Sequence, residues 1–173
     1  MIFRLLGGAV VFVSCTLLGI YYSMKDSHRI ADLSEFKKAL NLLKGEIEFN
    51  RRPLPEALEY VAKKVETEVG ALFSGVSKNL EPESGYDTAV AWAEALKTTL
   101  AETYLTREDI DNIGHLGETL GHVDIETQLS GMAMVNEYIE AQTDKLRTSE
   151  YGNKRLYRSA GVLVGFLIVV MLL

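Results

Sequence analysis

Three side chains near the middle of the chain have the residue types of a metal site. His115, Glu118 and His122 lie within eight positions of one another, and histidine and carboxylate side chains are common ligands of zinc and iron. Their spacing does not match the Glu-x-x-His motif of di-iron helical bundles, and the one other histidine, His28, lies far away in the sequence. We therefore predict no metal site, and a metal-dependent membrane enzyme is only an alternative function.

The sequence offers no phosphate-binding loop and no activated nucleophile. Gly70 and Gly75 have the spacing of the glycines in a P-loop, but Val76 stands where that motif requires lysine. No catalytic motif surrounds the serines or the single cysteine. We therefore predict that the protein is not an enzyme, and that it binds no cofactor and no small-molecule substrate.

Glu118 lies in a glycine-rich stretch, 113–121, that has the pattern of a helix. Its apolar residues recur at steps of three and four, and Thr106-x-x-Asp109 upstream has the pattern of a capping box. Each glycine inside a helix costs about 1 kcal/mol relative to alanine. We therefore expect another backbone to approach this surface closely at its three glycines, Gly114, Gly117 and Gly121.

Two interpretations of this surface remain open. In the first, it is tightly packed core, and Gly121 is the C-terminal cap of the helix. In the second, it is a docking surface on which Glu118 makes one acidic contact with a partner.

Two uncharged runs flank the middle of the chain. Leu5 to Met24 contains twenty residues, enough to cross a hydrocarbon core of about 30 Å at about 1.5 Å per residue. Ser159 to Leu173 contains fifteen, which is short for a full span. No A-x-A-like cleavage site follows the first run, so we predict a retained anchor rather than a signal peptide. The expected domains are an N-terminal anchor, a helical bundle and a C-terminal membrane segment, over residues 1–24, 25–158 and 159–173.

Charge indicates the orientation of the bundle and the kind of partner. Seventeen of the eighteen lysines and arginines lie between the two runs, and only Arg4 lies outside, so the positive-inside rule places residues 25–158 in the cytoplasm. From Pro53 to Asp144, 5 basic residues face 18 acidic ones. Such a surface repels nucleic acid and anionic lipid, so we expect a basic protein partner. A solvated acidic bundle is the alternative.

The periodicity between the runs is helical, without the alternation typical of strands. A first stripe steps three and four residues and can continue the N-terminal anchor without a break; it holds Leu33, Phe36, Leu40, Leu43 and Ile47. A second stripe covers 54–72, with an interruption expected at Gly70, and a short third segment covers 72–80.

Two aspartates mark further helix starts. Asp87 is predicted to cap a fourth helix, whose buried face would hold Val90 or Ala89, Trp92, Leu96 and Leu100. The glycine-rich stretch forms the fifth helix, and Asp124 caps a sixth that contains no proline and can run into the C-terminal segment. The predicted fold is an all-α six-helix bundle.

Three motifs give a family resemblance. Leu43-x-x-Glu46-Ile47-x-Phe49, Pro53-Leu54-x-Glu56-Ala57 and 113–121, ending in Gly117-Glu118-Thr119-Leu120-Gly121, resemble the stage III sporulation protein AB family. The order of anchor, acidic helical middle and apolar C-terminus agrees over essentially the whole chain. That family is itself similar to the cytoplasmic domains of the F protein of type II secretion systems and type IV pilus machines.

The resemblance implies a component of an inner-membrane platform. The platform would belong to the channel complex between mother cell and forespore, in the outer forespore membrane, with the bundle in the mother-cell cytoplasm. The implied partners are the secretion-type ATPase of the complex, stage III sporulation protein AA, and other membrane proteins of the same complex. A membrane-tethered scaffold that makes no contact with the ATPase is the rival interpretation.

Five residues are candidates for contacts with such a partner. We expect polar contacts from Glu46, Glu56 and Glu118, and close helix approach at Gly117 and Gly121. The alternative is that Glu46 and Glu118 pair inside the bundle, for instance with Arg51 or Arg52, and stabilise it.

Overall fold

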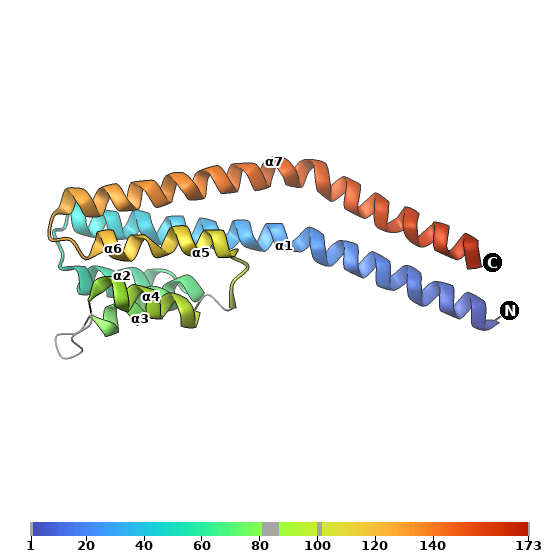
Figure 1. The fold of residues 1–173 in the computed structure, drawn as a ribbon, viewed down its shortest axis with the longest axis horizontal. Coiled ribbons are helices and arrows are strands. Elements are labelled where there is room, and N and C mark those ends of the chain that lie inside the picture. The colour runs from blue at the N-terminus through green and yellow to red at the C-terminus, as the bar shows by residue number, and fades with distance from the viewer. Residues whose placement is uncertain (1, 81–86, 100–101, 173) are drawn as a thin grey trace. The chain divides into compact units, whose positions relative to one another are not determined.

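The computed structural model describes the backbone of residues 2–80, 87–99 and 102–172, and the side chains of residue 14 and of 24–80, 87–99 and 102–148. All regular structure in these residues is helical (Figure 1). The chain forms two units, one made of residues 1–30 with 144–173 and the other of Ala31–Thr143. The second unit holds all of the predicted contact residues.

Seven helices are present in the described backbone: α1 (Ile2–Glu48), α2 (Leu54–Lys64), α3 (Glu68–Asn79), α4 (Thr88–Thr99), α5 (Arg107–Gly114), α6 (Leu116–Leu120) and α7 (Ile125–Leu172). The prediction of an all-α fold is confirmed, and α1 continues from the first apolar stripe into the N-terminal run. The glycine-rich stretch, which was predicted as one helix, is divided at His115 into two short helices, α5 and α6.

An aromatic cluster joins three helices at the core of the unit Ala31–Thr143. Phe36 of α1, Phe73 of α3 and Trp92 of α4 are fully buried, and their ring centroids lie 5.6 to 6.4 Å apart. The indole meets both phenyl rings edge to face, an arrangement that contributes about 0.5–1.5 kcal/mol per pair beyond area burial. The predicted first stripe is buried throughout and is therefore the core face of α1.

The second predicted stripe is interrupted earlier than expected. α2 ends at Lys64 and α3 begins at Glu68, so the interruption lies at 65–67 and not at Gly70. Gly70 lies inside α3, where an added Cβ would fall 1.7 Å from the Val65 carbonyl oxygen. Because only glycine leaves room for that carbonyl, Gly70 permits the close turn between α2 and α3 without being the place where the helix breaks.

The fourth helix begins where the sequence predicts, directly after Asp87. Trp92 and Leu96 lie on its buried face as expected. Of the two alternatives for the preceding position, Val90 is 50% exposed and does not belong to that face, whereas Ala89 is half-buried. Leu100 lies outside the described residues. The buried face turns slightly from the predicted one and consists of Ala91, Trp92, Ala95 and Leu96.

The side-chain caps predicted at Thr106 and Asp124 form. The Thr106 backbone N–H donates to the Asp109 carboxylate at 2.7 Å, and the Asp109 N–H donates to the Thr106 hydroxyl at 3.3 Å, which completes the capping box of α5. At the start of α7, Asp124 Oδ2 accepts from the hydroxyl and the backbone N–H of Thr127, at 2.9 and 3.0 Å. Both bonds lower the pKa of Asp124, and the bond from the Thr127 hydroxyl has the larger effect.

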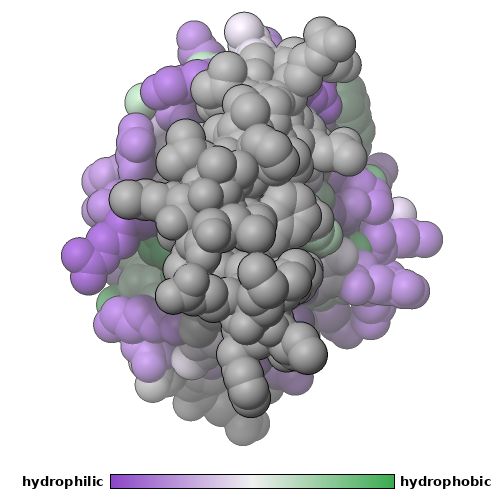
Figure 2. Space-filling view, turned by 90° about the vertical axis from the view of Figure 1, so that its right-hand side faces the viewer, coloured by the Kyte–Doolittle hydropathy of each residue, from purple (hydrophilic) through white to green (hydrophobic). Residues whose placement is uncertain are grey.

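The two predicted membrane segments fall almost entirely outside the residues whose side chains are described. The backbone of 5–24 belongs to α1, and that of 159–172 belongs to α7. Within the described part of the chain, no helix is both long and apolar enough to span a membrane. The two anchors therefore stay predictions. The coloured surface in Figure 2 is mainly hydrophilic, with smaller hydrophobic areas between the polar side chains.

Candidate interaction surface around Glu118

A side chain from another helix fixes the point at which the glycine-rich stretch divides. The Trp92 indole N–H of α4 donates to the Ile113 carbonyl at 3.0 Å in a buried hydrogen bond. Ile113 lies in the last turn of α5, where carbonyl groups have no partner within their own helix. His115 then serves as the C-cap of α5 and the N-cap of α6. The division of the predicted helix follows from this contact with α4.

The inner side of α6 is packed against the same tryptophan. A Cβ added at Gly117 would lie 2.6 Å from Trp92 Cβ, closer than real Cβ atoms approach. The close approach expected at Gly117 is therefore to a neighbouring helix of the same chain. Gly121 is the C-cap of α6, and its added Cβ would lie 3.3 Å from Thr88 Cβ. Gly114 differs, since a Cβ added there would lie 3.9 Å from Leu96 Cδ1, an ordinary van der Waals distance.

Glu118 lies on the outer side of α6. Its side chain is 74% exposed, and its carboxylate is 4.0 Å from His115 Nδ1, a weak contact between two solvated groups. The alternative of an internal pair with Arg51 or Arg52 is wrong for Glu118. The side chain is instead available at the surface, one residue after a glycine that holds α6 against the core.

Glu46 has the opposite environment. It is only 7% exposed, and Arg52 Nε lies 3.0 Å from its Oε2. Arg52 also lies over the Tyr60 ring of α2, 4.9 Å from the centroid. The internal pairing considered for Glu46 is the one observed, and it ties the end of α1 to α2. Glu56 is exposed in the first turn of α2, where a carboxylate complements the helix dipole.

The segment of chain that contains Glu118 is acidic. From Glu108 to Asp144 the chain has nine acidic residues and no lysine or arginine. Among the nine, Asp109 and Glu140 bond to other helices: buried Asp109 accepts a hydrogen bond from the Tyr138 hydroxyl of α7 at 2.9 Å, and Glu140 forms an ion pair with Lys37 of α1. The remainder of this segment presents acidic groups to solvent, which favours cationic partners.

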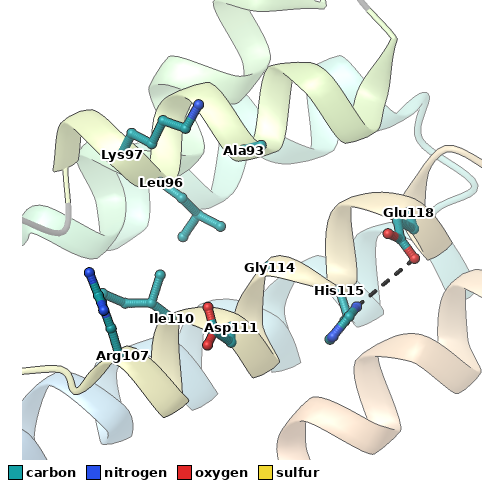
Figure 3. Close-up of a pocket in the computed structure, with 9 residues that line it drawn as sticks. All are labelled: Ala93, Leu96, Lys97, Arg107, Ile110, Asp111, Gly114, His115 and Glu118. Carbon is teal, nitrogen blue, oxygen red and sulfur yellow. Dashed lines mark ion pairs between the residues drawn. The ribbon is translucent and has the colours of Figure 1, made fainter.

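Two grooves meet at His115 and Glu118. The larger, about 860 Å³, lies between α4 and α5 and is shown in Figure 3. The smaller, about 210 Å³, lies between α6 and α7 and is bordered by Met134, whose side chain is 69% exposed. Glu118 and His115 line both grooves. They therefore form a ridge between two partly apolar depressions, an arrangement typical of a binding surface.

Sequence reasoning missed three features of this region. Gly131 of α7 meets α6 so closely that an added Cβ would fall 2.1 Å from Thr119 Oγ1. The hydrogen bond from Trp92 to Ile113 and the groove beside Arg107 were also missed. The only sequence signal for the Gly131 contact was a glycine inside a helix. The hydrogen bond and the groove depend on contacts between helices that are distant in the sequence.

The family model described as stage III sporulation protein AB matches residues 4–173. The chain belongs to this family. A curated relative, stage III sporulation protein AB of Bacillus subtilis (strain 168), is 28% identical over 171 residues, which cover 98% of this chain and 99% of the relative. A solved structure of a stage III sporulation protein AB is similar with a TM-score of 0.66 and 25% identity, over 72% of this chain and 98% of that one.

Family membership supports a role in sporulation. The match extends over nearly the whole chain, and it includes Glu46, the α2 segment and the α5–α6 ridge.

Proposed function

We propose that this chain is a non-enzymatic membrane platform protein that docks a cytoplasmic secretion-type ATPase onto the channel complex between mother cell and forespore. The observation that carries the proposal is the ridge at Glu118, because a charged side chain that is 74% exposed stands on a helix packed rigidly against Trp92. A rigid helix that presents a solvated charge between two apolar grooves suits a protein interface better than a catalytic site.

The proposed ATPase is stage III sporulation protein AA, and other membrane proteins of the complex are further partners. The proposed location is the outer forespore membrane. We place the bundle in the mother-cell cytoplasm because the basic residues lie between the two apolar runs, where the positive-inside rule expects the cytoplasmic side. The bundle would convert nucleotide-driven movement of the ATPase into movement or assembly of the channel.

Helix continuity supports such a coupling. α1 and α7 belong to the bundle, and each continues without a break through one of the two predicted membrane segments. Lys37 to Glu140 and Asn136 to Asn41 link the two helices within the bundle.

Binding of the full chain to the ATPase tests the proposal. The purified chain, held in detergent micelles, is titrated with the ATPase in the absence of nucleotide, with ADP and with a non-hydrolysable ATP analogue. We expect binding whose affinity differs between nucleotide states. Absence of binding in every state would reject the docking role and favour the scaffold that makes no contact with the ATPase.

A further inference from the structure

The groove between α4 and α5 results from the way Trp92 is held. Gly117 lets α6 lie directly on Trp92, and the indole N–H donates to the Ile113 carbonyl in the last turn of α5, so α4 is held against α6 and the C-terminal end of α5. α5 diverges from α4 beyond this point. At Gly114 the nearest approach of an added Cβ is 3.9 Å, to Leu96. The opening that results has Leu96, Ile110 and Ala93 along its walls (Figure 3).

Charge is distributed unequally along this groove. Arg107 and Lys97 lie at one end, and Glu118 lies at the other, with Asp111 on the α5 side between them (Figure 3). Lys97 is 3.9 Å from Glu94, so its charge is partly offset, and Arg107 is the main cation of its end. A ligand that fits this groove carries an acidic group at the Arg107 end and a basic group at the Glu118 end.

The shape of the groove favours a peptide over a small molecule. Small-molecule sites enclose most of the ligand and direct a few polar groups inward. Here the charged side chains are exposed, and the apolar residues form an open channel between two helices that run in roughly opposite directions. An amphipathic helix fits such a channel, because its apolar side chains at i, i+3, i+4 and i+7 lie along one face.

We propose that the α4–α5 groove docks an amphipathic helix of the partner, with the acidic end of that helix at Arg107 and its basic end at Glu118. This inference rests on the proposed docking role, and it specifies where the partner binds and in which direction. Arg107, Ala93 and Ile110 thereby become contact residues that no sequence motif identifies.

Two synthetic helical peptides test the proposal with the full chain. Both carry leucine at i, i+3, i+4 and i+7. The first, the dipolar peptide, has glutamates at one end and lysines at the other, and the second has glutamates at both ends. Fluorescence anisotropy should show that the wild-type chain binds the dipolar peptide about tenfold more tightly. Glu118→Arg makes both ends of the groove cationic, and this variant should prefer the peptide with two acidic ends.

A matched pair of alanine substitutions tests the position of the site. Ala93→Gln places a longer polar side chain in the groove and should weaken binding of the dipolar peptide about tenfold. Ala133→Gln makes the same change on an exposed position of α7 that lines neither groove and should leave binding unchanged. Both positions are exposed, so the thermal melts of the two variants should match wild type.

Several outcomes would overturn the proposal. They are failure of both peptides to bind, equal affinity of the two peptides for wild type, and insensitivity to Ala93→Gln. Self-association abolished by Ala93→Gln, with neither peptide bound, would assign the groove to a second copy of the chain. Binding of the ATPase that depends on Glu118 but not on Ala93 would remove the groove as the docking site and leave the docking role intact.

Discussion

Glu46 and Glu118 belong to motifs of the same family, yet they lie in opposite environments. Glu46 is buried at the end of α1 and forms an ion pair with Arg52, whereas Glu118 is exposed on α6, directly after a glycine packed on Trp92. One glutamate stabilises the corner between α1 and α2, and the other is displayed by a helix that is already held in place. Residue type and motif context therefore did not distinguish a structural glutamate from an interface candidate, and burial did.

The largest expected effect concerns the packing that supports Glu118. Gly117→Ala should lower the free energy of unfolding by about 1–3 kcal/mol, because the new Cβ would overlap the base of a tryptophan side chain that is fixed by its own hydrogen bond. Denaturant titration of the full chain measures this. Gly114→Ala is the matched control, since its Cβ has ordinary space, and it should be neutral or slightly stabilising. Equal losses of unfolding free energy in the two variants would contradict the close packing of Gly117 on Trp92 as the cause.

The second expected effect concerns the α1–α2 corner. Glu46→Ala should lower the free energy of unfolding by about 1–2 kcal/mol, because a partly buried guanidinium loses its partner. We expect a loss of unfolding free energy at the low end of the range for buried ion pairs, because the Arg52 side chain keeps 34% of its surface exposed. In a double-mutant cycle with Arg52→Ala, the two losses should be less than additive. Additive losses would show that the pair does not interact.

The cap of α7 gives a smaller effect that depends on pH. The pKa of Asp124 is lowered in the folded chain by its bonds to Thr127, so its contribution is present above the unfolded pKa and disappears as the pH falls through the folded pKa. Asp124→Ala should lower Tm slightly at neutral pH, and the difference from wild type should vanish at strongly acidic pH. Thr127→Ala should behave similarly. A Tm difference that persists in acid would assign the loss to something other than the ionised cap.

Local signals predicted the helices and their starts. The Thr106–Asp109 box, Asp124 and the stripe from Leu33 to Ile47 are recognisable from spacing because cap and stripe geometry involve residues only a few positions apart. The position of the break between α2 and α3 was not predictable in this way. Gly70 marks the close turn, but the break lies where the chain folds back, several residues earlier.

The candidate site was harder to predict, because its shape comes from contacts between distant segments. The tryptophan of α4 decides where the glycine-rich helix divides and how far α5 stands from α4. No pattern near Ile113 indicates that an indole from residue 92 will bond to its carbonyl. For the same reason, the groove residues Ala93 and Arg107 carry no motif of their own, although Glu118 beside them does.

The smallest effect on stability is expected at the residue with the largest expected effect on binding. Glu118→Ala should change the free energy of unfolding by less than about 0.5 kcal/mol, because the side chain is exposed. Glu137→Ala is a control of equal charge change on an exposed position of α7. Together the two variants separate a specific contact from a general change in net charge.

The most direct test is the affinity of the full chain for the ATPase, measured for wild type, Glu118→Ala and Glu137→Ala together with their thermal melts. We predict that Glu118→Ala weakens binding about tenfold with an unchanged melt, and that Glu137→Ala binds like wild type. Wild-type affinity in Glu118→Ala, or an equal loss in both variants, would contradict the assignment of this ridge as the docking surface.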